Sequence, residues 1–587
     1  MKTNSIKYGV VALSMSLGLS SCDNFLNRPT EDNYNADNYY STDAACLSGV
    51  NYLYNSPWYD FQRGFIKVGE VFSGNMYWGN SPYLNFSVNG TDEDLVNMSY
   101  SLWAVIGHCS TVYESIEKAE GASEAIKNQC MGEALAWKAM AYFYLVRTFG
   151  DVPIIHSNSA TLAEGNYNEL KKVQKADVYD YIILTLEKAL ELLPKHKDIE
   201  GRIDYFCAEG LLAKVYLTKA GVNGSLDNAD LQKAADLAKD VIDNSGRVLM
   251  ENYEDIFRGS NNVSDESLIA WRWTTEGNEW TRQNTLQSDL GIEGFCEVGN
   301  VWGGWGGPSA DLMEAFGVIE IEGYGLDSRL KTFDNPSSRA DIDTRRKATM
   351  MLAGDFYPYF WRDKGGFDYL RFIYDKSYNK DATGQLEGPC GCNNVKHLYG
   401  NAADHQAEMG MSDARMASAL ATHLLRLADV YLIHAEAMAL MGKGGEASAV
   451  DAYNKVHQRA IPTAAAVANV TFDMVWKERR LELAGEGDRW YDFVRRSYYD
   501  VNACIDELKK QHRNQMWNCD PLYKAYFESN TWNLETVDGT VEYNYEVDVP
   551  NVTENSFTIP FPTEDVALNP NLLAEPEHVD IRATYKY

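Results

Sequence analysis

The 587-residue chain lacks any run of about 20 consecutive apolar residues, the length that a helix needs to cross a bilayer. This excludes a transmembrane helix. Basic residues are also scarce, with 53 Lys and Arg against 84 Asp and Glu, and the formal net charge is -31. Because nucleic acids and anionic membrane surfaces attract basic patches, this imbalance argues against both as partners.

Cysteines are present, but their pattern argues against a disulfide framework. Apart from Cys22, nine cysteines are irregularly spaced along the chain, and their number is odd. We expect most of them to be small buried apolar side chains. Cys390 and Cys392 are too close together for a zinc knuckle and have no matching second pair, so we expect no metal there.

Catalytic motifs are missing as well. The sequence contains no G-x-S-x-G, H-E-x-x-H or Walker motif, and no G-x-G-x-x-G after a strand. Residues 379–384 (NKDATG) copy the first half of a calcium loop, but its twelfth position is Cys390, where a bidentate glutamate is needed. A glycosidase carboxylate pair is defined by distance in space, so the sequence leaves that alternative open. We expect no enzyme, no cofactor and no metal site.

One charged run, at residues 478–489, has the composition of a catalytic cluster. Carboxylates beside cations have shifted pKa values, which favours such an interpretation. We expect a structural role instead, because Glu478 and Glu482 lie four residues apart on a helix and can pair with Arg479, Arg480 or Arg489.

The N-terminus carries the motif of a lipoprotein signal peptide. Lys2 and Lys7 form a short basic start before an apolar stretch at residues 8–19. Leu19-Ser20-Ser21-Cys22 then completes a lipobox. Signal peptidase cuts before a cysteine that is already diacylated. We therefore expect residues 1–21 to be a lipoprotein signal peptide and Cys22 to carry the lipid anchor. An ordinary secretory signal with a chance cysteine is the alternative.

Helical periodicity dominates the rest of the sequence. Apolar residues recur at steps of three and four in residues 92–120, 123–148, 176–193, 205–219, 229–242, 424–440 and 446–459. Such pairs of helices, with alanine at their contacts, predict a mainly α fold, a tetratricopeptide-like helical-repeat scaffold decorated by long loops and short strands. The body at residues 22–587 then has helical repeats at about 92–243 and 420–500, and a loop-rich, ligand-facing region at about 244–419. Short strands are expected at residues 268–273 and 557–562.

Six segments make the chain resemble the SusD/RagB-like lipoproteins, in family order. They are CDNFL at 22–26 after the lipobox, residues 133–153 ending in FGDVP, AEGLLAKVYL at 208–217, RLADVYLIHAEA at 426–437, ERRLELAGEGDRWYDF at 478–493, and IPFP at 559–562 followed by NPNL at 569–572.

The resemblance implies a function. Proteins of this family are surface nutrient-binding partners of TonB-dependent, SusC-like outer-membrane transporters. It implies an outer-membrane lipoprotein that faces the cell exterior, binds an oligosaccharide and passes it to the transporter without cleaving it. A binder of peptide or another nutrient in the same kind of complex is one alternative, and a glycan-cleaving enzyme is another.

Aromatic residues outside the helices are the candidate ligand site. An indole stacks on the C–H face of a sugar ring, while amides and other polar groups bond its hydroxyls. In the resembling family, loops near two positions of this chain meet at a glycan platform. We therefore expect the glycan-binding residues to be Trp78, Asn80, Tyr83, Trp302 and Trp305. The alternative is that these rings fill the core.

Three further tryptophans lie in the middle region. Trp271 and Trp273 belong to a strand-like run, so we expect them in the core. Trp280 follows without an assigned role.

Overall fold

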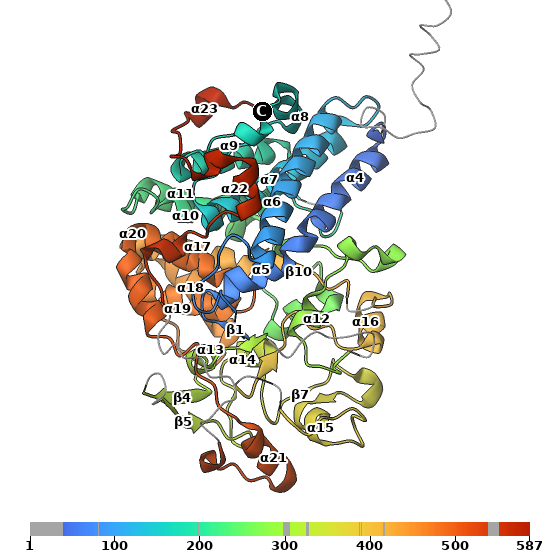
Figure 1. Ribbon diagram of the computed structural model, residues 1–587, viewed down its shortest axis with the longest axis vertical. Helices are drawn as coiled ribbons and strands as arrows, with labels where there is room; N and C mark the ends of the chain where they lie inside the picture. The colour runs from blue at the N-terminus through green and yellow to red at the C-terminus, as the bar shows by residue number, and fades with distance from the viewer. Residues whose placement is uncertain are drawn as a thin grey trace, which may run out of the picture.

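The computed structural model describes residues 39–79, 81–196, 199–296, 306–323, 328–386, 388, 390–414, 417–537 and 551–587. Long helices fill its upper half and left flank in Figure 1, and short helices and strand pairs fill the lower part together with α21 (Asp520–Ser529). The expected mainly α, tetratricopeptide-like fold is confirmed. Within the described ranges, no helix is both long enough and apolar enough to cross a membrane.

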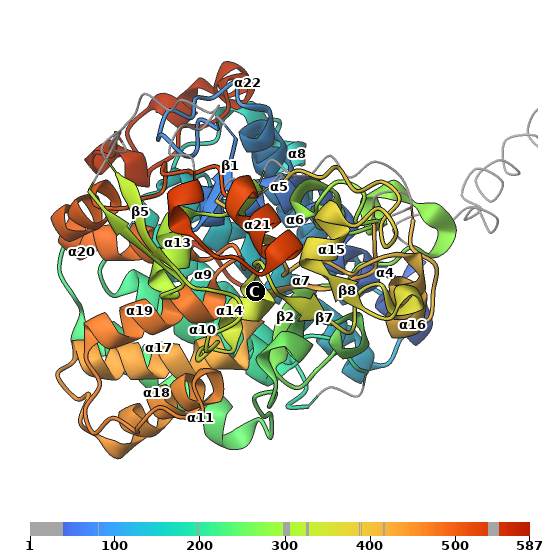
Figure 2. The same cartoon turned by 90° about the horizontal axis from the view of Figure 1, so that it is seen from below.

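The long helices form a packed row. α6 (Glu93–Glu117) packs on α7 (Glu124–Phe149), α7 on α9 (Lys175–Leu192), and α9 on α10 (Tyr205–Lys219). α10 then packs on α11 (Asn228–Asn244), α11 on α17 (Leu427–Leu440), and α17 on α18 (Ala447–Ala460). The row therefore joins an early and a late part of the chain, which Figure 2 shows from below. Three further helices contact the row: α4 (Asp43–Asn51) packs on α7, α19 (Phe472–Leu483) on α17, and α20 (Arg489–Lys509) on α7 and α10.

Local chemistry sets where these helices begin and end. The Asp92 carboxylate accepts a hydrogen bond from the Leu95 N–H at 3.1 Å and so caps α6. α7 ends at Gly150, whose φ of 74° suits a residue without a Cβ. The helix that we expected to begin at residue 424 begins at Leu427, because the residues before it form strand β10.

Short elements surround the row. Five antiparallel pairs link β1 (Met76–Trp78) with β3 (Gly306–Pro308), β2 (Ser267–Trp271) with β10 (Thr422–Arg426), β4 (Ile319–Glu322) with β5 (Arg329–Phe333), β6 (Met350–Met351) with β9 (Asn393–Asn394), and β7 (Phe356–Tyr357) with β8 (Phe367–Asp368). The short helices are α5 (Gln62–Ile66), α8 (Asn158–Glu164), α12 (Leu286–Leu290), α13 (Ala310–Ala315), α14 (Arg345–Thr349), α15 (Tyr369–Tyr374), α16 (Ala402–Met409), α21 (Asp520–Ser529), α22 (Thr563–Leu568) and α23 (Ile581–Thr584).

The expected strand at residues 557–562 is wrong. A 3-10 turn, Glu554–Phe557, occupies its start. Pro560 and Pro562 have no N–H to donate to a ladder, and the Ile559 N–H makes a single backbone bond to the Thr148 carbonyl at 2.8 Å.

The charged run at residues 478–489 is structural, but the partners that we expected for its carboxylates are wrong. Glu478 and Glu482 are buried and pair with residues from other segments, not with the arginines of their own run. Glu478 bonds Arg345 at 2.6 Å, and Glu482 bonds Arg426 at 3.0 Å and Arg459 at 2.6 Å. These pairs tie α19 to α14, β10 and α18. Periodicity within one helix could not reveal such distant partners.

Candidate ligand-binding recess

A solvent-open recess of about 200 Å³ lies beside the N-terminal end of α6. Three parts of the chain meet there: the 3-10 helix η2 (Ser56–Phe61) with α5, the first turns of α6, and the segment from the 3-10 helix η8 (Trp280–Arg282) to α12. The lining residues combine two aromatic rings with charged and polar groups: Tyr59, Asp60, Gln62, Arg63, Asp94, Asn97, Trp280, Thr285, Ser288 and Asp289.

An aromatic pair forms one wall. Trp280 is 47% exposed, and its ring centroid lies 6.1 Å from that of Tyr59 with the planes at 61°. A turn with positive φ at Gly277 (74°) and Asn278 (52°) leads into η8. Because the indole is exposed, it offers a flat apolar face next to polar groups, as a sugar ring requires.

An ion pair forms the polar side. Arg63 donates from Nε and Nη2 to the two Asp289 carboxylate oxygens at 3.2 and 3.0 Å. Burial raises the pKa of Asp289, and Arg63 opposes that shift. The Arg63 side chain is 50% exposed and that of Asp289 only 5%. The guanidinium is therefore fixed in direction while part of it stays open to hydroxyl oxygens of a ligand.

The recess is held in shape by its own hydrogen bonds. Gln62 accepts the Thr285 N–H at 2.9 Å and donates to the Gln283 carbonyl at 3.2 Å. These bonds join α5 to the segment before α12. The two walls are thus preorganised without a ligand.

Trp78 is linked to the recess through one lysine. The Lys67 ammonium pairs with Asp94, which lines the recess, and lies 5.3 Å from the centroid of the Trp78 ring. Trp78 is half-buried and pairs with Gly306 across β1 and β3. A Cβ at Gly306 would stand 3.1 Å from the indole, so glycine lets this ring lie close to β3.

Three of the other expected site residues cannot be placed, and the fourth, Tyr83, is buried. Asn80, Trp302 and Trp305 lie outside the described residues, and their roles remain predictions. Gly306, which directly follows Trp305 in the sequence, pairs with Trp78.

Tyr83 requires a correction. Its side chain is 0% exposed, and its hydroxyl donates to Asp92 Oδ1 at 2.7 Å. Burial raises its pKa. Its ring lies 5.2 Å from that of Phe72, so it belongs to the core and offers no face to a ligand.

The structure separates the three tryptophans of the middle region. Trp271 and Trp273 are 0% and 5% exposed, which confirms that they belong to the core. Trp280 lines the recess, and the sequence analysis assigned it no role. Its neighbours in the sequence NEWTRQ are polar or charged, whereas Trp271 lies in an apolar strand, and this contrast was an available signal.

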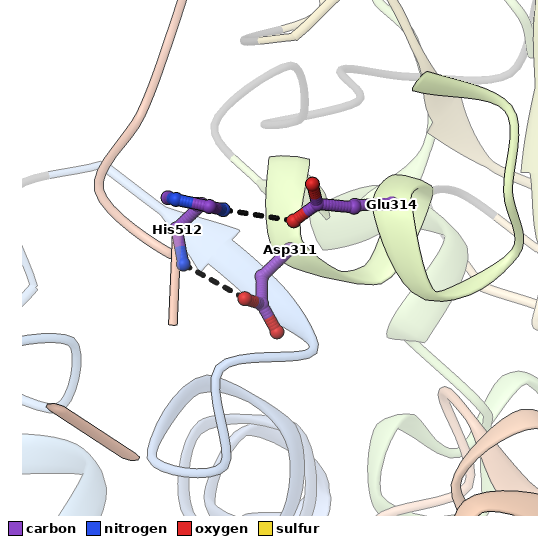
Figure 3. Close-up of side chains that lie close together, drawn as sticks. All are labelled: Asp311, Glu314 and His512. Atoms are coloured by element: carbon purple, nitrogen blue, oxygen red, sulfur yellow. Dashed lines mark hydrogen bonds and ion pairs between the residues drawn. The ribbon is translucent and has the colours of Figure 1, made fainter. Parts of the chain in front are cut away.

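A cluster of Asp311, Glu314 and His512 brings together possible metal ligands, as Figure 3 shows. His512 Nδ1 lies 2.8 Å from Glu314 Oε2, and the His512 backbone N–H donates to Asp311 Oδ1 at 2.7 Å. Asp311 Oδ2 accepts from Arg480 at 2.6 Å, and Glu314 Oε1 accepts from the Ile321 N–H at 3.1 Å. Each carboxylate oxygen already has a partner, and Arg480 supplies the positive charge. The cluster is a structural contact between α13 and the segment after α20.

The cysteines behave as expected. All nine that fall within the described ranges are buried and free of disulfide bonds. Burial raises the pKa of the Cys390 thiol to about 12. Cys22, the expected lipidation site, lies outside the described residues.

Comparisons with known proteins agree with this architecture. The profile described as "SusD family" matches residues 272–578, and that described as "Starch-binding associating with outer membrane" matches residues 51–217. A SusD-like protein of Bacteroides ovatus is 31% identical over 582 residues, which cover 97% of each chain. SusD-like protein P2 of Formosa agariphila is 24% identical over 431 residues, covering 70% of this chain and 73% of that protein.

Solved structures share the fold. A crystal structure with xylogluco-oligosaccharide is 28% identical, has a TM-score of 0.74, and is matched over 92% of this chain and 100% of that one. Surface glycan-binding protein A from Bacteroides thetaiotaomicron, in complex with laminarihexaose, has a TM-score of 0.63 at 16% identity, over 91% and 99% of the two chains. Because nearly the whole length matches at 31% identity and the family profile covers more than half of the sequence, the chain belongs to the SusD family.

Proposed function

We propose that this protein is an outer-membrane lipoprotein that captures an oligosaccharide at the cell surface and passes it to a TonB-dependent, SusC-like transporter without cleaving it. The recess at Trp280 is the observation that carries the proposal. It combines an exposed indole face with a half-exposed guanidinium held by Asp289. Stacking on the ring and hydrogen bonds to hydroxyls are the two interactions that a sugar offers.

The comparisons support the ligand class. A relative that matches over nearly the whole chain was crystallised with xylogluco-oligosaccharide. The formal charge of -31 also favours a neutral ligand over an anionic one.

A binding screen with product analysis tests the proposal. The purified protein is titrated with a panel of neutral oligosaccharides and, separately, with peptides, and each mixture is then analysed by mass spectrometry. We expect at least one oligosaccharide to bind and to remain at full length. Binding of peptides alone would favour another nutrient, and shortened oligosaccharide would favour an enzyme.

The lipid anchor is a separate part of the proposal. No helix in the described ranges can span a bilayer, and the lipobox at Cys22 offers the attachment point. Replacement of Cys22 by Ala should move the protein from the membrane fraction to the soluble fraction, because a lipid chain provides the binding energy. If the Cys22→Ala protein still sediments with membranes at high salt in cells that lack the transporter, the anchor is elsewhere.

The exposed face of α6 supports a protein partner. From Leu95 to Tyr113 this helix has no Asp, Glu, Lys or Arg, although part of its face is open to solvent. Tyr100 is 67% exposed. Gly107 lies at the middle of the face with only Asn158 Nδ2, at 3.9 Å, near the position of a Cβ. Glycine inside a helix costs about 1 kcal/mol, and nothing within the described chain requires it here. Close approach of another molecule to this position would explain why the helix has a glycine there.

We infer that the transporter covers this face. A second copy of the chain would bring two strongly acidic bodies together, so charge disfavours self-association. The face also begins at Asn97, which lines the recess. A partner seated on α6 would therefore stand beside the ligand.

Replacement of Gly107 by Arg tests this contact. Purification from native membranes in mild detergent should recover a much larger outer-membrane protein with the wild type and much less with Gly107→Arg. Helix propensity favours Arg over Gly, so the variant should keep or raise its melting temperature. Ala447→Arg, at the exposed start of α18, is the matched control. If Gly107→Arg recovers as much of the partner as the wild type does, α6 is not part of the interface.

A further inference from the structure

The recess at Trp280 is too small to hold a whole oligosaccharide. Its volume is about 200 Å³, whereas pockets that enclose drug-sized ligands measure about 300 to 1,000 Å³. A sugar chain that stacks on Trp280 must therefore extend beyond the recess. On the side of Asp94 the neighbouring aromatic ring is that of Trp78, because the Lys67 ammonium pairs with Asp94 and lies 5.3 Å from the Trp78 centroid. Trp78 is half-buried, so the core does not enclose it completely.

A single buried amide joins the recess to the β1–β3 strand pair that contains Trp78. Asn394, in β9, is 1% exposed, and its Nδ2 donates to the Gly306 carbonyl at 3.0 Å and to the Leu290 carbonyl at 3.4 Å. Gly306 pairs with Trp78 across the two strands. Leu290 ends α12 and directly follows Asp289, which lines the recess. One side chain thus bonds an element of each part.

This amide is the polar link between the two elements. Within the described ranges, no hydrogen bond joins α12 to β3 directly. Two carbonyl oxygens accept only from a donor, so the Nδ2 of Asn394 has to face them. Its Oδ1 is buried and has no hydrogen-bond partner among the described residues. An unpaired buried acceptor is costly, and an apolar side chain would avoid that cost. The bridge that Nδ2 makes gives a physical reason for an amide here.

We propose that Asn394 is a positioning residue for glycan binding. It holds the Trp280 recess and the Trp78 ring at one spacing, and the ligand is an oligosaccharide long enough to contact both. This inference rests on the proposed function. Because Asn394 is buried, it acts through α12 and β3 and does not touch the ligand. A ligand that spans two contact points gains affinity only when both fit at once, whereas a short sugar in the recess needs no fixed spacing.

Calorimetric titration with two fragments of one oligosaccharide tests the proposal. A disaccharide and a hexasaccharide are cut from an oligosaccharide that binds in the screen described above, and each is titrated into the full-length protein in detergent. The wild type should bind the hexasaccharide about 5- to 150-fold more tightly, as expected for one additional stacked ring. Asn394→Leu, which removes the donor, should lose most of this preference while its affinity for the disaccharide changes by less than about 2-fold. Asn394→Ser leaves room for water at the two carbonyls, so it is the milder variant to measure if Asn394→Leu does not fold.

Asn393→Leu is the matched control. Asn393 precedes Asn394 on the same strand and is equally buried, but its Oδ1 accepts from the Tyr369 hydroxyl in α15, which does not line the recess. Both kinds of variant should lower the melting temperature, because each removes a buried hydrogen bond. Only the Asn394 variants should lose the preference for the hexasaccharide, which separates positioning from stability.

Two results would overturn the inference and leave the proposed function intact. One is a wild type that binds both fragments with equal affinity. The other is a preference for the hexasaccharide that persists in the folded Asn394 variants. Failure of the wild type to bind any oligosaccharide would instead overturn the proposed function and this inference with it.

Discussion

Two arginines show how two parts of the molecule use the same chemistry for different roles. One part is the recess, and the other is the frame, by which we mean the row of long helices with α19, α20 and the β2–β10 pair. Arg426 lies in the frame with a side chain that is 1% exposed, and it bonds Glu266, Glu482 and Glu486. Arg63 lies in the recess, bonds Asp289 alone, and is 50% exposed. The first guanidinium has all its donors committed to the protein. The second is oriented by its carboxylate but keeps donors for a ligand, so exposure distinguishes the two roles.

Two tryptophans repeat the contrast. Trp271 is fully buried, with its ring 5.5 Å from Trp58 and 5.2 Å from Phe65. Trp280 lies nine residues further along the chain and is half exposed beside Tyr59. One ring therefore stabilises the core, and the other is free to bind.

The largest expected effect is on the frame. Replacement of Arg426 by Met leaves Glu266, Glu482 and Glu486 buried without their central cation, and breaking a buried pair costs about 3–5 kcal/mol. We expect a large fall in melting temperature in calorimetry. Any protein that remains folded should bind glycan with unchanged affinity. A variant as stable as the wild type would show that these pairs do not hold the frame together.

The two tryptophans provide the next comparison. Trp271→Ala should lower stability by about 3–5 kcal/mol through lost core packing. Trp280→Ala should leave the melting temperature nearly unchanged but weaken glycan binding by about 5- to 150-fold, which is roughly 1–3 kcal/mol by analogy with bases stacked on aromatic rings. Thermal melting and titration of both variants measure this. Unaltered affinity in Trp280→Ala would exclude its ring from the site.

Acid should act on the frame in a defined pH window. Burial alone raises the pKa of Glu486, but Arg426 and Lys396 together lower it to about 2. The folded pKa lies below the unfolded value of about 4.3. Above about pH 4.3 the ionised carboxylate therefore stabilises the fold in full, and this stabilisation is lost as the pH falls from about 4 to 2. The contribution is roughly 3 kcal/mol.

Melting curves from pH 6 to pH 2.5 measure this acid effect. Glu486→Gln should show a smaller loss of stability over the same range. An identical acid profile in the variant would contradict the assignment to Glu486.

The smallest expected change in stability is at the recess. Arg63→Met leaves the nearly buried Asp289 carboxylate without its partner, so the free energy of unfolding should fall by about 1–3 kcal/mol, less than at the fully buried Arg426. Glycan affinity should fall by about 10-fold, as expected for a lost charged hydrogen bond. Arg63→Lys should retain part of the affinity. If Arg63→Met binds as tightly as the wild type, the guanidinium does not contact the ligand.

The fold could be predicted largely from sequence because its signal is local. Apolar steps of three and four, together with caps such as Asp92 and stops such as Gly150, fix the long helices to within a few residues. The failures involve long-range contacts. Glu482 finds its arginines outside its own helix, in β10 and α18.

The candidate site was less predictable for the same reason. Trp78 was expected in the site, and the structure links it to the recess through Lys67 and Asp94. Trp280 and Arg63 meet only because separate segments fold together, and no spacing within either segment reveals the pairing. Whether an aromatic ring is buried depends on what packs against it, which a single sequence does not specify.

A crystal structure of the protein soaked with an oligosaccharide that it binds tests the central claim most directly. We expect one sugar ring to stack on the exposed face of Trp280 and its hydroxyls to bond Arg63 or Asp289. The sugar should be intact. An oligosaccharide bound away from this recess, with Trp280 and Arg63 untouched, would contradict the account.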